Sequence, residues 1–111
     1  MPELSLVITV KNEEENIAPL LAAVHSALRG MDYEVILVDD GSTDQTKKRI
    51  IEEADERTWL VELRKNYGQS NAMMAGIDQA KGNYIALLDG DLQNDPSDIP
   101  AMLELLKKED W

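Results

Sequence analysis

Two acidic residues separated by one glycine, Asp89-Gly90-Asp91, directly follow an apolar run at residues 84–88. Such a run is typical of a buried strand, so the two carboxylates stand just past a strand end. Carboxylates in this arrangement can converge on one divalent cation, and Mg²⁺ commonly shares its oxygen ligands with a substrate phosphate. For a single acidic turn of this kind, a helix cap or a solvated loop is the simpler interpretation.

A second acidic pair, Asp39-Asp40, follows another strand-like run at residues 34–38. The carboxyl ends of parallel strands meet at one edge of a sheet, and open α/β sheets bind their ligands at that edge. We therefore expect both pairs to gather there with Asn12 and Glu13, which follow the first strand-like run. This combination predicts a site for a metal-bound nucleotide.

The composition limits how a metal could be bound. The 111-residue chain has no cysteine and a single histidine, His25. Disulfides, thiolate sites, histidine-based zinc sites and Ser-His-Asp triads are therefore excluded, and any metal must bind through oxygen. The formal net charge of −11 argues against nucleic acid as a partner, because phosphate-backbone binding needs clustered lysine and arginine. An anionic ligand would need a cation to mediate its binding.

Nothing in the sequence indicates a membrane segment or a leader. No apolar run approaches the ~20 residues that a spanning helix needs. The N-terminus enters a strand almost at once, without a signal-peptide pattern. The lack of cysteine fits a reducing compartment. We therefore expect a cytoplasmic protein of one domain.

Apolar periodicity predicts four strands alternating with four helices. The strands are expected at residues 4–10, 33–38, 59–63 and 84–88, and the helices from residue 15 or 16 to Gly30, beyond Gln45, over residues 72–80, and after Pro96. Ser42 and Gln45 match a capping box at the start of the second helix. The order βαβαβαβα implies an α/β fold with a parallel sheet, right-handed crossovers and helices on the sheet faces.

Four sequence segments occur in a recognisable order and spacing across almost the whole chain. They are Val10-Lys11-Asn12-Glu13-Glu14-Glu15-Asn16, Val38-Asp39-Asp40-Gly41-Ser42-Thr43-Asp44, Asn66-Tyr67-Gly68-Gln69 and Leu88-Asp89-Gly90-Asp91-Leu92-Gln93. Together they resemble the nucleotide-binding half of a family 2 glycosyltransferase with the Rossmann-like GT-A fold. The last segment looks most like the dolichol-phosphate mannosyltransferase and bacterial polyprenyl-phosphate glycosyltransferase branch.

The resemblance implies a UDP- or GDP-sugar donor and a divalent cation, Mg²⁺ or Mn²⁺. It implies that Asp89, Asp91 and Gln93 hold the metal, with Gln93 contributing its amide oxygen. Asp39 is expected to face the nucleobase or ribose, whereas Asp40 is expected to hold the following turn. The implied nucleotide-sugar site comprises Thr9, Lys11, Glu13, Asp39, Asp89, Gly90 and Asp91.

Two site positions depart from the family pattern, which has proline at position 9 and often an aromatic residue at position 11. Here these positions are Thr9 and Lys11. Lys11 can contact phosphate instead of stacking on a base, so the sequence does not establish which residues contact the nucleobase. Gly68 marks a loop that either approaches phosphate or forms a plain turn.

Members of this family are much longer than 111 residues. The resemblance implies that residues 1–111 are the donor-binding half, and that the acceptor site and the usual catalytic base lie elsewhere. No acidic residue here matches the motif of that base, so the catalytic residue is unknown. The implied reaction is inverting transfer to an acceptor such as a polyprenyl phosphate, with the full-length parent at the cytoplasmic face of the membrane. We expect the chain alone to bind donor without completing transfer.

The resemblance also implies that neighbouring strands of the family's sheet are missing beside residues 84–88. That strand would then be an edge with apolar side chains, which invites pairing with a second copy in a homodimer.

Two other functions remain open at this point. A phosphorylatable receiver domain is also small, acidic and α/β. Receivers resemble one another in placing their acidic pair after the first strand, whereas the acidic pairs of this chain follow the second and fourth expected strands. A nucleotidyltransferase would use a similar fold and metal, but would want a Gly-rich, basic loop where this chain has Asn12-Glu13-Glu14-Glu15.

Overall fold

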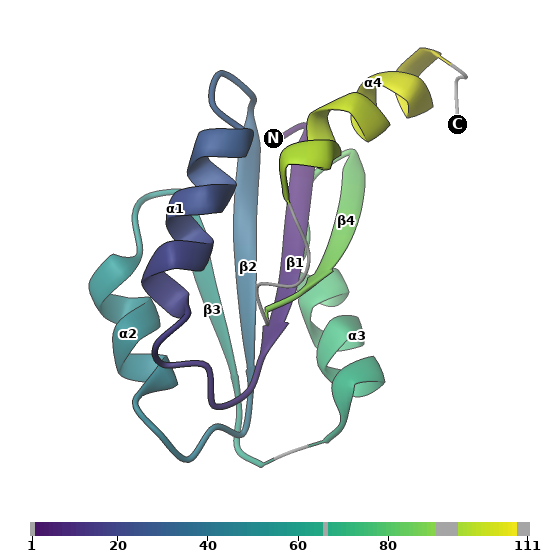
Figure 1. Ribbon diagram of the computed structural model, residues 1–111. Helices are drawn as coiled ribbons and strands as arrows, with labels where there is room; N and C mark the ends of the chain where they lie inside the picture. The colour runs from purple at the N-terminus through teal and green to yellow at the C-terminus, as the bar shows by residue number, and fades with distance from the viewer. Residues whose placement is uncertain (1, 66, 91–95, 109–111) are drawn as a thin grey trace.

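The computed structural model describes residues 2–65, 67–90 and 96–108, and its elements alternate as expected from the sequence (Figure 1). In chain order they are β1 (Leu4–Val10), α1 (Ile17–Ala27), β2 (Tyr33–Asp40), α2 (Thr46–Glu53), β3 (Thr58–Leu63), α3 (Gln69–Gln79), β4 (Tyr84–Asp89), the short 3₁₀ helix η1 (Pro96–Asp98) and α4 (Ile99–Lys108).

The four described strands form one parallel sheet in the order β3-β2-β1-β4. The central strands β1 and β2 are buried at every position, because helices cover both faces of the sheet. The edge strands β3 and β4 are more exposed. The parallel α/β architecture predicted from the sequence is confirmed, and all four strand ends point to the bottom of Figure 1.

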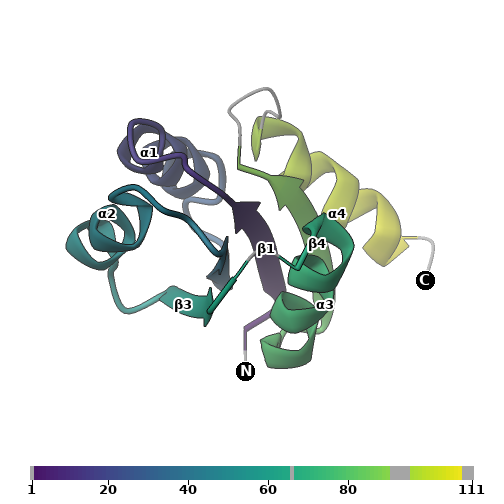
Figure 2. The same ribbon diagram turned by 90° about the horizontal axis from the view of Figure 1, so that it is seen from below.

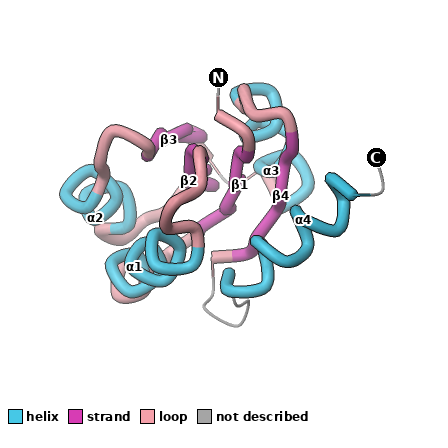
Figure 3. Tube along the Cα trace, turned by 90° about the horizontal axis from the view of Figure 1, so that it is seen from above, coloured by secondary structure: helices cyan, strands magenta, loops and turns pink. Residues whose placement is uncertain are grey.

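Among the described helices, α1, α2 and α4 lie on one face of the sheet and α3 lies on the other (Figures 2 and 3). The larger core cluster lies under α1, α2 and α4 and includes Leu6, Ile8, Ile17, Val35 and Leu103. The smaller cluster lies under α3 and consists of Val7, Ile36, Val38 and Ala72.

The small residues of α3 let its backbone approach the sheet closely. A Cβ atom at Gly76 would lie 2.4 Å from Val7 Cγ1 and 2.9 Å from Val38 Cγ2. These distances are too short for carbon atoms, so no larger residue fits without displacing the helix or the valines. This contact fixes α3 against β1 and β2.

The predicted start of the first helix is confirmed, but the predicted capping box is wrong. α1 begins at Ile17, so Pro19 falls in its first turn. α2 begins at Thr46, and the Ser42 hydroxyl accepts a hydrogen bond from the Asn12 amide instead, at 2.9 Å. Asp44 Oδ1 accepts the Thr46 amide at 2.9 Å. The Ser42 hydroxyl therefore binds the Asn12 amide, which is distant in sequence, and not an amide at the start of α2 as the capping-box pattern predicted.

Strand β4 is an edge of the described sheet, as predicted. Ile85 and Leu87 are 45% and 47% exposed. Both residues help to line an apolar groove of about 510 Å³ that β4 and α4 border. In the parts of the chain described, no helix has the length and apolar character needed to cross a membrane.

Candidate functional site

The loops after β1 and β2 are joined by hydrogen bonds into one wall at the carboxyl edge of the sheet. Besides the Asn12–Ser42 contact, Thr43 N donates to Asn12 Oδ1 at 2.8 Å. Glu13 N donates to Thr46 Oγ1 at 2.9 Å. Asn12 has φ 53°, a left-handed conformation that asparagine tolerates better than most residues. These contacts fix the backbone that carries the candidate residues of the first loop.

Asp44 strengthens this wall. Its carboxylate accepts the Thr46 amide and hydroxyl through Oδ1, and the Glu14 amide through Oδ2 at 3.4 Å. Burial alone would raise the pKa of Asp44, but these hydrogen bonds from Thr46 and Glu14 hold the pKa below its ordinary value. The carboxylate therefore stays charged and keeps the two loops together.

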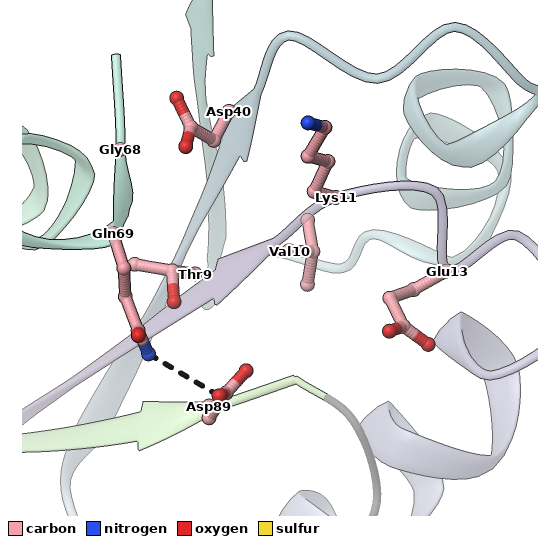
Figure 4. A pocket seen from close by; sticks show the side chains of 8 residues that line it. All are labelled: Thr9, Val10, Lys11, Glu13, Asp40, Gly68, Gln69 and Asp89. Carbon is pink, nitrogen blue, oxygen red and sulfur yellow. Dashed lines mark hydrogen bonds between the residues drawn. The ribbon is translucent and has the colours of Figure 1, made fainter. Parts of the chain in front are cut away.

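A cavity of about 290 Å³ opens beside this wall, at the ends of β1, β2 and β4 and the start of α3 (Figure 4). Its volume is at the lower end of the ~300–1,000 Å³ typical of ligand sites. The lining residues are Thr9, Val10, Lys11, Glu13, Asp40, Gly68, Gln69 and Asp89. Four predicted site residues, Thr9, Lys11, Glu13 and Asp89, are thus brought together.

Strand geometry explains which side chains reach the cavity. Thr9 is aligned with Asp89 on the neighbouring strand, so both side chains leave the sheet on the same face. Val10 is aligned with Asp39, and Asp40 is the next residue along β2. Side chains alternate along a strand, so Asp40 shares the face of Thr9, and Asp39 shares the opposite face with Val10.

The expected roles of the two aspartates after residue 38 are partly reversed. Asp39, not Asp40, holds the following turn, because its Oδ1 accepts the Ser42 amide at 3.0 Å. Asp40 lines the cavity, and its Oδ1 accepts the Tyr67 amide at 2.9 Å. Both carboxylates are nearly buried, at 3% and 5% exposure. The expected contact between Asp39 and a nucleotide stays a prediction.

Asp89 is held at the end of β4 by its neighbours. Gln69 Nε2 donates to Asp89 Oδ2 at 3.2 Å. The Gly90 amide donates to the Thr9 carbonyl at 3.0 Å and extends the pairing of β4 with β1. A Cβ atom at position 90 would lie 2.5 Å from Val10 Cγ1 and 2.9 Å from Thr9 O. A larger residue would therefore clash with β1, which explains why a glycine lies between the two acidic residues. A direct contact of Gly90 with donor stays a prediction.

The cavity is acidic, and of the described residues that line it, Lys11 alone is basic. Two bare like charges ~4 Å apart repel by about 4 kcal/mol at an effective dielectric near 20. A phosphorylated ligand would therefore meet repulsion from the carboxylates of Glu13, Asp40 and Asp89. A divalent cation beside the ligand would remove that repulsion.

The donor types fit a hard cation, although the described residues supply only part of a ligand set. Carboxylate oxygens suit Mg²⁺ and Mn²⁺. No group of three or more acidic or histidine side chains within residues 2–65, 67–90 and 96–108 is arranged to hold a metal by itself. The expected ligands Asp91 and Gln93 lie outside the described residues.

The single histidine takes no part in this site. His25 Nδ1 lies 2.5 Å from the hydroxyl of Tyr33, and its Nε2 lies 3.6 Å from Asp55. Tyr33 is the first residue of β2, so this contact is at the opposite end of the sheet.

Residues 5–110 match the protein family described as Glycosyl transferase family 2. The chain belongs to this family. The resemblance stated from the four motifs is confirmed, and the receiver and nucleotidyltransferase interpretations are set aside.

Curated relatives of this glycosyltransferase chain are much longer. Dodecaprenyl-phosphate galacturonate synthase from Rhizobium johnstonii is 47% identical over 111 residues, covering 96% of this chain and 33% of the relative. Undecaprenyl-phosphate 4-deoxy-4-formamido-L-arabinose transferase from an Enterobacter species is 42% identical over 106 residues, covering 91% and 32%. The chain therefore spans about a third of the length of these relatives.

Solved structures agree on the GT-A fold. The mannosyltransferase PcManGT from Pyrobaculum calidifontis, in complex with GDP-Man and Mn²⁺, superposes with a TM-score of 0.84 at 23% identity. That match covers 95% of this chain and 32% of the other. S. aureus TarS 1-349, in complex with UDP-GlcNAc, gives 0.78 at 24% identity, covering 96% and 31%.

Sequence reasoning missed two polar lining residues, Asp40 and Gln69. The resemblance assigns Asp40 to the turn, and the apolar pattern of β2, which is buried on both faces, gives no sign of which residues face the cavity. Gln69 belongs to one of the four motifs, but nothing in its sequence context indicated a partner on β4.

Proposed function

We propose that residues 1–111 are the donor-binding half of a family 2 glycosyltransferase and bind a UDP- or GDP-sugar together with Mg²⁺ or Mn²⁺ at the carboxyl edge of the sheet. The single observation that carries this proposal is the acidic cavity formed by the ends of β1, β2 and β4. The match to glycosyltransferase family 2 and the GDP-Man and Mn²⁺ bound to one structural neighbour support it.

In this proposal Asp89 binds the cation with Asp91 and Gln93. Mg²⁺ sites of this kind use one or two carboxylates and take further oxygens from substrate phosphates, so a complete protein cage is not required. When bound, the cation supplies positive charge that stabilises the diphosphate leaving group. Asp89 is fixed for this role by the strand end and by the Gln69 amide.

The nucleoside is proposed to lie against the joined loops after β1 and β2. Thr9, Lys11 and Glu13 reach the cavity from β1 and its loop, and Lys11 offers an ammonium group to a phosphate. Asp39 is proposed to accept a hydrogen bond from the base or ribose. Glu13 Oε2 already accepts a hydrogen bond from the side-chain Nδ2 of Asn16 at 2.6 Å, which orients its carboxylate.

The acceptor is proposed to be a polyprenyl phosphate, because the curated relatives are named for dodecaprenyl- and undecaprenyl-phosphate products or acceptors. The full-length protein would then work at the cytoplasmic face of a membrane. Inverting transfer needs a base to deprotonate the acceptor. We assign that base and the acceptor site to the two-thirds of the relatives that this chain does not cover, so the chain alone binds donor without completing transfer.

A thermal-shift panel tests the donor proposal. UDP- and GDP-sugars are added to the chain with Mn²⁺ or with EDTA. We expect one nucleotide class to raise the melting temperature in Mn²⁺ and to have little effect in EDTA. Equal shifts with and without metal, or no shift with any nucleotide, would contradict the proposal. Mass spectrometry after acetyl-phosphate treatment provides a check on the receiver alternative, and no phosphorylation is expected.

We also propose that two copies associate through β4. Among the described residues that line the groove between β4 and α4, Asp98 alone is charged. A chain of net charge −11 would meet less self-repulsion there than elsewhere, and the unpaired strand edge favours strand pairing. Light scattering should give twice the 12.4 kDa chain mass, and Leu87→Lys should restore the monomer. A wild-type mass of 12.4 kDa would refute the dimer.

A further inference from the structure

Gln69 is the first residue of α3, and its side chain reaches across to the end of β4 (Figure 4). Its Nε2 donates to Asp89 Oδ2 at 3.2 Å. Gln69 is exposed and lines the cavity, so the contact is not needed to fill the core. The side-chain amide of Gln69 therefore lies beside the Asp89 carboxylate, which is proposed to bind the cation.

The start of α3 is held in place independently of this contact. The Tyr67 amide donates to Asp40 Oδ1 at 2.9 Å, just before the helix. Gly68, the N-cap residue, has φ 92°, a conformation that glycine adopts readily. Farther along, Gly76 fixes α3 against the sheet. The backbone thus presents the Gln69 amide to β4 from a rigid support.

The chemistry of an amide suits a neighbour of a metal-binding carboxylate. A neutral N–H group fixes the orientation of Asp89 without cancelling its charge, whereas a lysine or arginine would compete with the cation. Hydrogen bonds from outside the ligand set commonly orient metal-binding carboxylates, and their loss typically costs 10–100-fold in metal affinity.

We propose that Gln69 is a positioning residue that orients the Asp89 carboxylate for the divalent cation. This inference rests on the proposed function, since it requires that Asp89 binds a metal. It assigns Gln69 no contact with the cation itself.

The test measures Mn²⁺ binding directly, by electron paramagnetic resonance of free Mn²⁺ during titration of the 111-residue chain. Gln69→Leu removes the donor at similar size and should weaken Mn²⁺ binding about tenfold, at the lower end of such effects. Gln79→Leu is the matched control, because it changes an exposed glutamine at the other end of the same helix. It should bind Mn²⁺ like the wild type. Thermal unfolding without metal should be the same for all three proteins.

A second variant separates orientation from charge. Gln69→Lys keeps an N–H donor but adds a positive charge, so its loss of Mn²⁺ affinity should shrink as KCl is raised. The loss in Gln69→Leu should not depend on KCl in this way.

The outcomes distinguish this inference from the proposed function. If wild type binds Mn²⁺ and Gln69→Leu binds it equally well, the positioning role is refuted while the donor proposal stands. Equal losses in Gln69→Leu and Gln79→Leu refute it as well, because the effect would then belong to the helix. If wild type binds no Mn²⁺, both proposals fall.

Discussion

The face of the sheet that α3 covers carries polar side chains at both of its ends, and the two ends differ. Ser5 and Glu34 stand near the amino ends of β1 and β2, whereas Thr9 and Asp40 stand near the carboxyl ends. All four side chains are at most 6% exposed. The two ends are about 20 Å apart along β2.

At the amino end, which we call the closed end, the polar side chains are hydrogen-bonded by the chain itself. Glu34 Oε2 accepts the Ser5 hydroxyl at 2.6 Å and the Lys81 amide at 2.8 Å. The Ser5 oxygen in turn accepts the Gly82 amide at 2.8 Å. The loop from α3 to β4 therefore turns its amides inward, and the cavity beside Glu34 measures about 110 Å³, against about 290 Å³ at the carboxyl end.

At the carboxyl end the corresponding loop from β3 to α3 leaves a cavity. One of its amides, that of Tyr67, reaches Asp40, and Gln69 reaches Asp89. The carboxylates of Asp40 and Asp89 line about 290 Å³ of open space. The comparison shows that residue type does not decide the role of a nearly buried carboxylate. The adjoining loop decides it, by closing the carboxylate with its own amides or by leaving space for a ligand.

The largest effect on stability is expected from opening the closed end. Glu34→Ala leaves the Lys81 amide and the Ser5 hydroxyl without their acceptor, and should lower the free energy of unfolding by about 2–4 kcal/mol. Urea unfolding measures this. Glu62→Ala is the control, because Glu62 pairs with Lys47 at the surface and should cost at most about 1 kcal/mol. Similar losses in the two variants would contradict the structural role of the closed end.

A smaller loss is expected from the middle of α3, which links the two ends. Gly76→Ala forces a Cβ atom against Val7 and Val38 and should cost about 1–3 kcal/mol, despite the better helix propensity of alanine. Ser70→Ala, at an exposed position of the same helix, should change stability by less than about 0.5 kcal/mol. Chemical denaturation compares the pair. A Gly76→Ala protein as stable as Ser70→Ala would mean that the helix contact is loose.

The open end should behave in the opposite way. Asp89→Asn is expected to leave the free energy of unfolding within about 0.5 kcal/mol of wild type, because Asp89 is only partly buried and lies in an acidic cavity. The same change should weaken nucleotide binding in Mn²⁺ at least about tenfold, measured by calorimetry. Asp39→Ala should instead weaken nucleotide binding while leaving the binding of Mn²⁺ in the absence of nucleotide unchanged. Loss of stability in Asp89→Asn with binding unchanged would invert the assignment of the two ends.

The smallest effect concerns the acid limb of the stability curve. The pKa of Asp44 is below its ordinary 3.8 in the folded chain, so its contribution is present above that value and is lost as pH falls through the lowered pKa. Asp44→Asn should therefore flatten part of the loss of stability below about pH 4. Only part is expected, since hydrogen bonds also lower the pKa of Asp55 against the effect of its burial. An unchanged acid limb would show that the Asp44 contacts contribute no stability.

The sequence predicted the sheet and the gathering of acidic strand ends, because both follow from apolar runs and from the geometry of parallel crossovers. The four strands were found within one residue of the expected bounds, except that β2 extends two residues farther, to Asp40. Thr9, Lys11, Glu13 and Asp89 meet in one cavity for the same reason.

The details that failed depend on contacts distant in sequence. The Ser42 hydroxyl binds an amide from the first loop, which no local capping pattern can reveal. The turn is held by Asp39 and not by Asp40, and β2 is buried on both faces, so hydrophobicity does not indicate which of the two faces α3. The contact of Gln69 with Asp89 requires knowing where α3 begins and which strand it meets.

Paramagnetic broadening by Mn²⁺ tests most directly whether the open end binds metal and the closed end does not. The chain is labelled with ¹⁵N and titrated with Mn²⁺ in the presence of UDP or GDP, with Mg²⁺ as the diamagnetic control. Because broadening falls steeply with distance, the amide signals of Val10 and Gly90 should disappear first, while those of Ser5 and Gly82 persist. Broadening that is strongest at Ser5 and Gly82, or that is uniform across the chain, would contradict the account.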